Sequence, residues 1–387
     1  MRILGKGQTA KALQNKFINA VMYDDNDIDT YDFDSEELTV VSPGIPPYKN
    51  MVKNSLNICS DYDIFAKDMP YSIWISGTNG KTTTTQMIQH LLQEYGSVYG
   101  GNIGVPISSL STDAKYWILE TSSFTLHYTN KAKPNIYVLL PISDDHVSWH
   151  GTFKDYEQSK LKPLGMMNKD DIAIIPYKYK DVKSDARIYT YKDSIDLATQ
   201  FNIDTTKIKF KDPFLMDSLM ALICSSLVED KIDYNKINQF KVDEHKVEQF
   251  RDKKGNLWVN DSKATNVDAT IWALKGFKDK KIRLILGGDD KGADLKPLFE
   301  QLQQYDISIY NIGTNTNKLQ HLAQIYNISC SSCFDLKTAV SRIKILNKIE
   351  KENKENIVSI LSPAASSLDQ YGSYALRGKE FKNLVLN

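Results

Sequence analysis

A glycine-rich turn between an apolar segment and a helical one carries the clearest chemical signal in the chain. It reads Ile75-Ser-Gly-Thr-Asn-Gly-Lys-Thr82, with Lys81 and Thr82 at the expected start of the helix. Such a turn directs backbone N–H groups and the positive end of the helix toward anionic oxygens. Lys81 can neutralise nucleotide phosphates, and the Thr82 hydroxyl can ligate Mg²⁺. The turn therefore predicts a phosphate-binding loop.

This loop departs from the standard P-loop pattern G-x-x-x-x-G-K-S/T, because Ile75 stands where the first glycine is expected. The alternative is a glycine turn with an exposed lysine, which the strand before it and the helix after it disfavour. A phosphate-binding loop alone is compatible with a kinase, a GTPase or a ligase.

Two polar segments follow strands expected in the same sheet. Glu120 comes at the end of the strand expected at 116–119, and His146 follows the strand expected at 136–140. Open α/β sheets bind ligands at the carboxyl ends of their strands, and Mg²⁺ prefers oxygen ligands beside phosphate. Glu120 and His146 are thus candidates for a metal and substrate site. From composition alone, Lys160 on the following helix is a solvated lysine.

The elements that must position these residues alternate along the whole chain between short apolar, β-rich runs and helical periodicity, which is typical of α/β folds with mostly parallel sheets. Strands are expected at residues 1–4, 38–41, 71–75, 116–119, 136–140, 172–175, 257–259, 282–286 and 357–361. Helices are expected at 11–18, 81–94, 214–228, 267–274, 296–304 and 372–386. The pattern predicts three domains in series, at residues 1–70, 71–243 and 244–387.

Composition excludes several classes of protein. The chain has 387 residues, and 48 lysines and arginines balance 48 aspartates and glutamates, so no overall charge attracts nucleic acid or a membrane surface. It shows no apolar signal segment and no apolar run of about 18 residues. We expect a cytoplasmic monomer whose four cysteines are reduced, structural thiols.

Taken together, these segments resemble the Mur ligase family, whose phosphate loop T-G-T-N-G-K-S/T is matched by Ser76-Gly-Thr-Asn-Gly-Lys-Thr82. The resemblance continues through Gly101-Asn-Ile-Gly-Val-Pro106, Glu120-Thr-Ser-Ser-Phe124, Asp145-His146 and Tyr156-x-x-x-Lys160. It implies a small Rossmann-like first domain, a central P-loop ATPase domain and a Rossmann-like third domain. The family carbamylates its lysine, which would make Lys160 an anionic metal ligand.

The resemblance also implies which residues act on the nucleotide. ATP and two Mg²⁺ ions would be the cofactors, with one ion on Thr82 and Glu120 and the other on His146 and carbamylated Lys160. Lys81, Glu120, His146 and Lys160 would be the catalytic residues. The ATP contacts would come from Gly77, Thr78, Asn79, Gly80, Lys81, Thr82, Thr83, Asp217, Lys246, Asp261 and Lys263.

Two of these positions depart from the family pattern. The adenine-binding segment H-N-x-x-N corresponds to Pro213-Phe-Leu-Met-Asp217, where only Asp217 could still serve. Lys246 stands in His245-Lys-Val-Glu248 where the family has arginine, which keeps the charge and gives up bidentate geometry.

Within the family, the third unit is similar to that of the members that add D-glutamate. The matching segments are Trp258-Val-Asn-Asp-Ser-Lys-Ala-Thr-Asn266, Leu286-Gly-Gly-Asp-Asp-Lys-Gly-Ala-Asp294 and Leu361-Ser-Pro-Ala-Ala-Ser-Ser-Leu-Asp-Gln-Tyr371. The resemblance implies D-glutamate contacts from Thr265, Lys291, Ser367, Leu368 and Tyr374. It implies contacts to a UDP-sugar from Gly5, Gly7, Asp24, Ser42, Gly44, Asn102, Ser123 and His146.

The activity expected from this resemblance is ATP-dependent addition of D-glutamate to UDP-N-acetylmuramoyl-L-alanine in peptidoglycan precursor synthesis. The partners would be these two substrates and ATP, with no nucleic acid or membrane. The alternatives are a folylpolyglutamate synthase-like ligase, which lacks the D-glutamate segments, and a P-loop GTPase or non-catalytic nucleotide-binding homologue.

Overall fold

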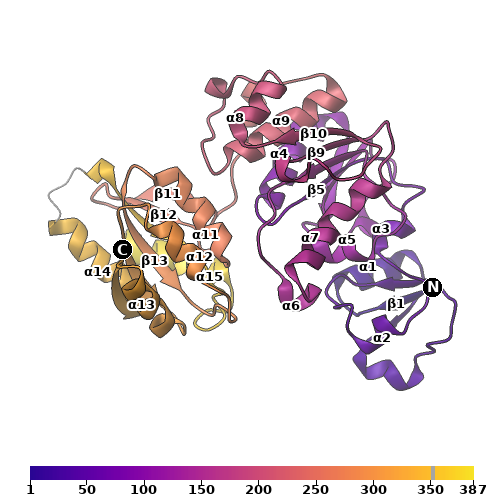
Figure 1. Ribbon diagram of the computed structural model, residues 1–387, viewed down its shortest axis with the longest axis horizontal. Helices are drawn as coiled ribbons and strands as arrows, with labels where there is room; N and C mark the ends of the chain where they lie inside the picture. The colour runs from indigo at the N-terminus through magenta and orange to yellow at the C-terminus, as the bar shows by residue number, and fades with distance from the viewer. Residues whose placement is uncertain (350–353) are drawn as a thin grey trace. The chain divides into compact units, whose positions relative to one another are not determined.

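The computed structural model describes residues 1–349 and 354–387 (Figure 1). The chain forms two compact units, one of Met1–Phe210 with Phe214–Phe240 and the other of Lys211–Pro213 with Lys241–Asn387. The chain therefore passes from one unit to the other at three points. The first unit contains two sheets and the second contains one.

The first sheet is small and parallel, with strand order β2-β1-β3-β4. Its strands are β1 (Arg2–Leu4), β2 (Val21–Tyr23), β3 (Thr39–Val41) and β4 (Ile58–Cys59). The helices beside it are α1 (Gln8–Lys16), α2 (Asn50–Lys53) and α3 (Asp61–Ile64). Apolar residues of this sheet and of the next one share a single core, which includes Ile3, Val40, Trp74 and Trp117.

The second sheet has six parallel strands in the order β10-β9-β8-β5-β7-β6. These are β5 (Tyr71–Ser76), β6 (Ser97–Gly101), β7 (Tyr116–Glu120), β8 (Ile136–Leu139), β9 (Ile172–Pro176) and β10 (Arg187–Tyr191). The helices are α4 (Lys81–Leu92), α5 (Ser123–Tyr128), α6 (Val147–His150), α7 (Phe153–Leu161), α8 (Ser194–Gln200), α9 (Leu215–Glu229) and α10 (Tyr234–Gln239). Because β5 lies between β7 and β8, the segments after these three strands meet at one edge.

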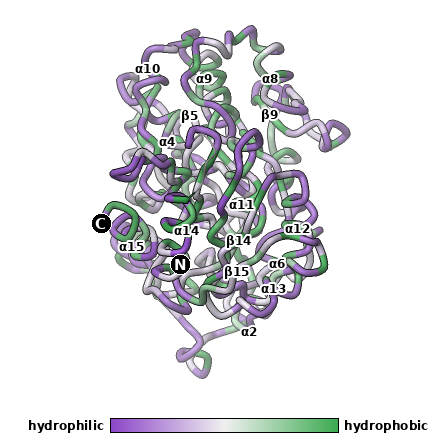
Figure 2. Tube along the Cα trace, turned by 90° about the vertical axis from the view of Figure 1, so that its left-hand side faces the viewer, coloured by the Kyte–Doolittle hydropathy of each residue, from purple (hydrophilic) through white to green (hydrophobic). Residues whose placement is uncertain are grey.

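The central strands read as nearly continuous apolar runs because helices cover the sheet, and all but the first residue of β5 are buried. Helix α4 packs against α9, whose apolar sequence is drawn largely in green in Figure 2. No helix among residues 1–349 and 354–387 has the length and apolarity that crossing a membrane requires.

The third sheet, in the second unit, has the order β11-β12-β16-β13-β14-β15 and is parallel except at β11. Its strands are β11 (Glu248–Arg251), β12 (Leu257–Asn260), β13 (Lys281–Gly287), β14 (Ile307–Ile312), β15 (Ser329–Phe334) and β16 (Ile357–Leu361). Its helices are α11 (Val267–Leu274), α12 (Lys296–Leu302), α13 (Thr316–Ile325), α14 (Leu336–Ile349) and α15 (Tyr374–Leu386).

The α/β class with mostly parallel sheets is confirmed, and the predicted strands lie within one or two residues of their expected bounds. The predicted bounds of four helices were wrong by two or three residues, since α12 ends at Leu302 and α15 begins at Tyr374, and α1 and α4 also differ. Helix α1 begins at Gln8 and not at residue 11, and α4 ends at Leu92, after which Gln93–Tyr95 form a 3-10 turn. Seven strands were not predicted, namely β2, β4, β6, β10, β11, β14 and β15. Apart from β14, they are short, contain glycine or are rich in polar residues.

Candidate functional site

The predicted phosphate loop runs from the end of β5 into α4. Gly77 and Gly80 have φ angles of 139° and 86°, in the left-handed region that favours glycine. A Cβ on Gly77 would lie 2.5 Å from Leu140 Cβ, and one on Gly80 would lie 2.7 Å from Asp217 Oδ1. No side chain caps the start of α4 at Gly80. The loop therefore lies close against its neighbours and leaves the positive helix end available to an anion.

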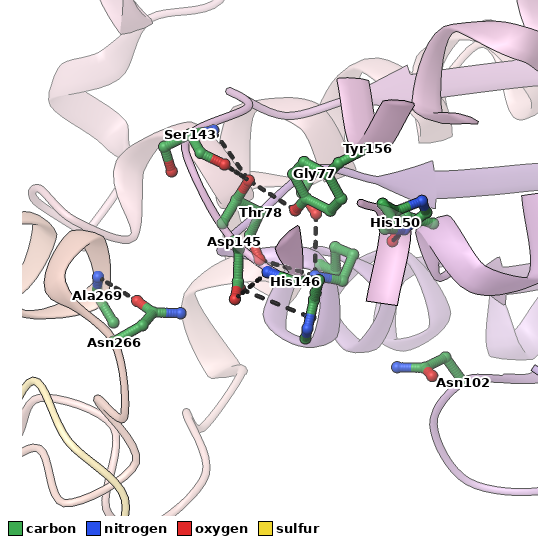
Figure 3. A network of polar contacts seen from close by, with 12 residues as sticks. Gly77, Thr78, Asn102, Ser143, Asp145, His146, His150, Tyr156, Asn266 and Ala269 are labelled. Atoms are coloured by element: carbon green, nitrogen blue, oxygen red, sulfur yellow. Dashed lines mark hydrogen bonds and ion pairs between the residues drawn. The ribbon is translucent and has the colours of Figure 1, made fainter. Parts of the chain in front are cut away.

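The loop is tied to the segment after β8 and to α7 through Thr78 (Figure 3). The Thr78 hydroxyl donates to the Ser143 carbonyl oxygen at 3.1 Å and accepts from the Ser143 N–H at 3.0 Å. The Tyr156 hydroxyl lies 2.9 Å from it. Sequence reasoning assigned no role to Tyr156 itself, although its position one helical turn before Lys160 places both side chains on one face of α7. Of the other predicted loop residues, Thr83 is buried, and Asn79 and Thr82 are half-buried.

Lys160 is 1% exposed, so its interpretation from composition as a solvated lysine was wrong. Its Nζ donates to the Gly77 carbonyl oxygen at 2.8 Å and lies 4.7 Å from the centre of the Tyr156 ring. Burial lowers the pKa of Lys160 well below its usual value, and the charge of Lys81 lowers it further. The carboxylates of Asp145 and Glu120 act in the opposite direction. The arrangement favours a neutral amine.

Lys81 lies at the same edge of the sheet. Its Nζ donates to the carbonyl oxygens of Gly77 at 3.0 Å and Thr78 at 2.7 Å. The side chain thus lies over the phosphate loop, where an ammonium group can neutralise phosphate.

Glu120 ends β7 and pairs in register with Ile75, directly before the phosphate loop. The side chain is 3% exposed. Its Oε1 accepts a hydrogen bond from Asn102 Nδ2 at 2.7 Å, whereas its Oε2 is buried without a hydrogen-bond partner. A buried carboxylate oxygen without a partner is costly unless a cation or donor reaches it. Glu120 is therefore suited to binding a metal ion.

His146 precedes α6 with a left-handed φ of 53° and is exposed. Its Nε2 lies 3.6 Å from Asp145 Oδ2, and its ring packs against Phe124 with 4.7 Å between ring centres. Asp145 therefore orients the imidazole at the edge where Glu120 and Lys160 also lie.

The predicted substrate residue Ser123 is buried, and its Oγ lies 3.0 Å from His150 Nε2. Burial lowers the pKa of His150 to about 4, and the charges of His127, His146 and Lys160 also lower it. His150 is therefore neutral near pH 7 and engages the Ser123 hydroxyl within the protein.

A cavity of about 450 Å³ lies beside the first sheet and the second. Its wall includes five of the residues predicted to bind a UDP-sugar, namely Gly5, Gly7, Ser42, Gly44 and Asn102. Ser123 and His146 are not among its lining residues. Ser42 Oγ is buried without a hydrogen-bond partner, and a Cβ on Gly5 would lie 2.6 Å from it. The cavity thus brings most of the predicted set together.

Asp24 lies on a neighbouring cavity of about 370 Å³, which also borders Gly5 and Gly44. Its carboxylate pairs with Lys6 at 3.1 Å and accepts from the Asn26 N–H at 3.0 Å. The fold therefore uses this side chain to shape the loop after β2.

Asp217, the remaining candidate near the adenine, is buried in the first turn of α9. Its Oδ1 accepts from the Thr84 hydroxyl at 2.9 Å and lies against Gly80. The side chain thus supports the phosphate loop from α9.

Asp261 follows β12 in the second unit and is 5% exposed. It accepts hydrogen bonds from Ser362 Oγ at 2.7 Å and from the Val247 N–H at 3.2 Å. Burial raises the pKa of Asp261 to about 7, although these two donors and the charges of Lys246 and Arg377 lower it. Asp261 is thus a buried acid at the carboxyl edge of the third sheet.

The segment after Asp261 brings Lys263 close to Tyr374, with Nζ 5.8 Å from the centre of the ring. Thr265 and Tyr374 are exposed, as a substrate contact requires. The buried Arg377 guanidinium holds this segment, since it donates to Ser262 Oγ at 3.0 Å and to the Ser262 carbonyl oxygen at 2.9 Å.

Lys291 is exposed on the loop after β13, with a left-handed φ of 50°. Asp289 and Ser366 exchange backbone hydrogen bonds of 3.0 and 2.9 Å, which place this loop beside the segment of Ser367 and Leu368. Ser367 is buried, and Leu368 is exposed. The structure therefore places three of the predicted D-glutamate residues on two adjacent loops.

The loop of Lys291 is fixed through its neighbour Asp290. Asp290 Oδ2 accepts from Lys318 Nζ at 3.0 Å and from Asn315 Nδ2 at 3.2 Å. Asn315 Oδ1 in turn accepts from the Gly288 N–H at 3.1 Å. Sequence reasoning missed Asn315 and Lys318, which lie some distance along the chain.

Comparison with known proteins identifies the family. The chain is 47% identical over 401 residues to the UDP-N-acetylmuramoylalanine–D-glutamate ligase of Campylobacter jejuni strain RM1221, covering 99% of this chain and 98% of that protein. It is 42% identical over 422 residues to the ligase of the same name from Helicobacter pylori strain J99, covering 99% of both chains. The chain belongs to the UDP-N-acetylmuramoylalanine–D-glutamate ligase family. The resemblance read from the motifs is thereby confirmed.

Two further comparisons concern the middle domain and the fold. Residues 75–212 match the model of the Mur ligase middle domain. The fold is similar to that of a MurF ligase from Thermotoga maritima in complex with ADP, with a TM-score of 0.60 at 15% identity over 99% of this chain and 93% of that one. The match to the middle domain covers the phosphate loop, Glu120, His146 and Lys160.

The predicted Mg²⁺ ligands of this chain include only one protein carboxylate, that of Glu120. Among the residues that the structure describes, no three His, Cys, Asp or Glu side chains gather in a metal-binding group. The predicted ligand set contains only Glu120 and His146 of these types, and its other members are the Thr82 hydroxyl and modified Lys160. The unpartnered Oε2 of Glu120 is the observation in the structure that supports an ion at this edge.

Proposed function

We propose that the chain is an ATP-dependent ligase that joins D-glutamate to UDP-N-acetylmuramoyl-L-alanine, giving an amide, ADP and phosphate. The observation that carries the proposal is the convergence of the phosphate loop, buried Glu120 and buried Lys160 at one sheet edge. The end-to-end match to relatives that bear the name of this activity supports the choice of substrates.

The proposed reaction has two steps. The alanine carboxylate of the nucleotide-sugar attacks the γ-phosphorus of ATP, so that an oxygen–phosphorus bond forms and ADP leaves. The amine of D-glutamate then attacks the acyl carbon of this acyl phosphate, forming the carbon–nitrogen bond and releasing phosphate. Phosphoryl transfer depends mainly on positioning and charge neutralisation, which Lys81 and the helix end of the loop supply.

The loop residues 77–83 would bind the ATP phosphates, and Asp217 would support the loop from α9. From the second unit, Lys246, Asp261 and Lys263 would contact the nucleotide. A lysine at position 246 contributes charge without the forked geometry of arginine.

Two Mg²⁺ ions would be held by Thr82 and Glu120 and by His146 and carbamylated Lys160. When bound, Mg²⁺ neutralises the charge of the phosphate oxygens. The lowered pKa of Lys160 supports its modification, because a neutral amine is the form that attacks CO₂. The contact between Lys160 Nζ and the Gly77 carbonyl oxygen holds the amine beside the phosphate loop.

The nucleotide-sugar would occupy the cavity of about 450 Å³. Asn102 lies in the cavity wall and donates to Glu120 Oε1, so one end of this cavity adjoins the expected metal ligand. That placement would bring the alanine end of the substrate toward the γ-phosphate and leave the nucleotide toward Gly5 and Ser42.

D-glutamate would be bound by the second unit, where the Lys291 ammonium can pair with a substrate carboxylate. Thr265 and Ser367 would orient it with their hydroxyl groups, and Leu368 and Tyr374 would supply apolar contact. We assign residues 1–70 to UDP-sugar binding, 71–243 to ATP and 244–387 to the amino acid. The enzyme would act as a monomer in the cytoplasm.

Phosphate release by the purified protein tests the proposal. The assay contains ATP, Mg²⁺ and UDP-N-acetylmuramoyl-L-alanine, with D-glutamate, L-glutamate, L-lysine or diaminopimelate offered in turn. Release is expected with D-glutamate alone. Release with all four amino acids, or with none, would contradict the assignment.

A further inference from the structure

A buried acid lies in the wall of the proposed nucleotide-sugar cavity and has no role in the chemistry above. Asp61 begins α3, directly after the capping residue Ser60, and it is 5% exposed. It lines the cavity together with Gly5, Ser42 and Asn102. Its Oδ1 is buried without a hydrogen-bond partner. Leaving such an atom unpaired costs about 1–3 kcal/mol, so a ligand that pairs it would be bound more tightly.

A second polar atom in the same wall is also unpaired. Ser42 Oγ is buried without a hydrogen-bond partner, and Gly5 packs too closely against it for any side chain at position 5. Two unpaired polar atoms in one cavity wall indicate that the cavity takes a polar ligand.

The surroundings of Asp61 favour its protonated form. Burial raises the pKa of Asp61 to about 7, and the charge of Asp63 on the same helix raises it as well. The backbone N–H groups of Asp61 and Tyr62 act in the opposite direction. Lys6, the other charged residue of the cavity wall, is paired with Asp24 and Asp27.

We propose that Asp61 determines specificity for the nucleotide-sugar by donating a hydrogen bond from its protonated carboxyl group to an acceptor oxygen of the UDP-N-acetylhexosamine moiety. A carboxylate would repel a diphosphate and has no proton to donate, whereas a carboxylic acid donates one. The inference rests on the proposed function, since it takes the cavity to be the nucleotide-sugar site. It adds a residue that binds this substrate in one protonation state only.

Calorimetric titration of UDP-N-acetylmuramoyl-L-alanine into the full chain without ATP tests the inference. If only protonated Asp61 binds, the Kd of the wild type should rise roughly 30-fold between pH 6 and pH 8.5. Binding at pH 8.5 should take up one proton, seen as a dependence of the heat on the ionisation enthalpy of the buffer. UDP-N-acetylglucosamine should show the same pH dependence, because it contains the moiety that we assign to the acceptor.

Variants separate the role of the proton from that of packing. Asp61→Asn keeps a donor that does not titrate, so its Kd should change less than about threefold over this range. Asp61→Ala should bind about tenfold more weakly than the wild type at pH 6. Asp68→Asn removes the same charge from an exposed position just beyond α3 and should behave like the wild type.

Binding by the wild type without pH dependence or proton uptake would overturn the inference, even if Asp61→Ala fails to fold. So would an Asp61→Asn variant that is as weak as Asp61→Ala, or a pH dependence absent from UDP-N-acetylglucosamine. These results differ from failure of the proposed function, in which the wild type would not bind the nucleotide-sugar at any pH.

Discussion

Replacing Asp261 by asparagine should stabilise the second unit while it removes ligase activity, and the gain in stability should grow with pH. Asp261 is 5% exposed, and burial raises its pKa from 3.8 to about 7. Asparagine has nearly the same shape and can still accept the hydrogen bond from the Val247 N–H. It carries no charge that the fold must desolvate.

The sign of the effect follows from proton binding. Between pH 3.8 and about 7 the folded protein keeps the proton of Asp261 and the unfolded chain releases it. Stability therefore falls by about 1.4 kcal/mol for each pH unit in this window and is constant above it. Relative to a neutral residue, Asp261 contributes about −2 kcal/mol to the free energy of unfolding at pH 5.5 and about −4 kcal/mol at pH 8.5. The advantage of Asp261→Asn should thus grow by about 2 kcal/mol between these values.

Native-state hydrogen exchange of the amides of β12 and β16 measures the unfolding free energy of this unit without reference to the other. Asp306→Asn, at an exposed position of the same unit, is the matched control and should show no such trend. An advantage of Asp261→Asn that is equal at pH 5.5 and pH 8.5 would refute the reasoning, because Asp261 would then not hold its proton in the folded state. Loss of phosphate release in this variant tests the separate assignment of Asp261 to the nucleotide.

Three further substitutions test the site. Lys160→Ala should lower phosphate release by about 100-fold, and a short carboxylic acid should restore part of it if a carbamate is a metal ligand. A variant with the wild-type rate would show that Lys160 has no such role. Lys318→Met removes one of the two side-chain donors to Asp290, which lies beside Lys291. The KM for D-glutamate should therefore rise about fivefold while the KM for ATP stays unchanged. A rise in both KM values would indicate general damage. Thr84→Val removes the 2.9 Å hydrogen bond to Asp217, so it should destabilise the first unit by about 1–3 kcal/mol and raise the KM for ATP. An unchanged KM for ATP would show that this hydrogen bond does not support the phosphate loop.

The phosphate loop could be predicted from the sequence because its signal is local. A short apolar run, two glycines with special φ angles and a lysine at a helix start lie within eight residues, so the pattern itself fixes the geometry. Glu120 was predictable for a related reason, since the carboxyl ends of parallel strands meet at one edge whatever the details of packing.

Lys160 shows where local reasoning ends. Its helix segment, Tyr156-Glu-Gln-Ser-Lys160, is polar and reads as a solvated surface. Only the placement of α7 against the phosphate loop buries the amine, and the resemblance to a family, not the residue pattern, anticipated this. Asp61 was missed because an aspartate is rarely buried unless it is paired, so its sequence context predicts an exposed side chain.

The edge strands were missed for a physical reason of another kind. β10 reads Arg-Ile-Tyr-Thr-Tyr, and only its last residue is buried. Such a strand forms because its backbone pairs with β9, and backbone pairing leaves little trace in side-chain hydropathy.

The three crossings of the chain between its two units have a practical consequence for dissecting the enzyme. Residues 211–213 belong to the second unit, and the Asp212 carbonyl oxygen would lie 2.8 Å from a Cβ on Gly276, yet the chain on both sides of them belongs to the first. A protease that cuts after residue 240 would separate residues 241–387 from residues 1–240. Residues 211–213 would stay covalently attached to the piece 1–240, although they belong to the second unit. Of two recombinant pieces divided at this point, the piece 241–387 would lack residues 211–213 of its own unit, and the piece 1–240 would carry them.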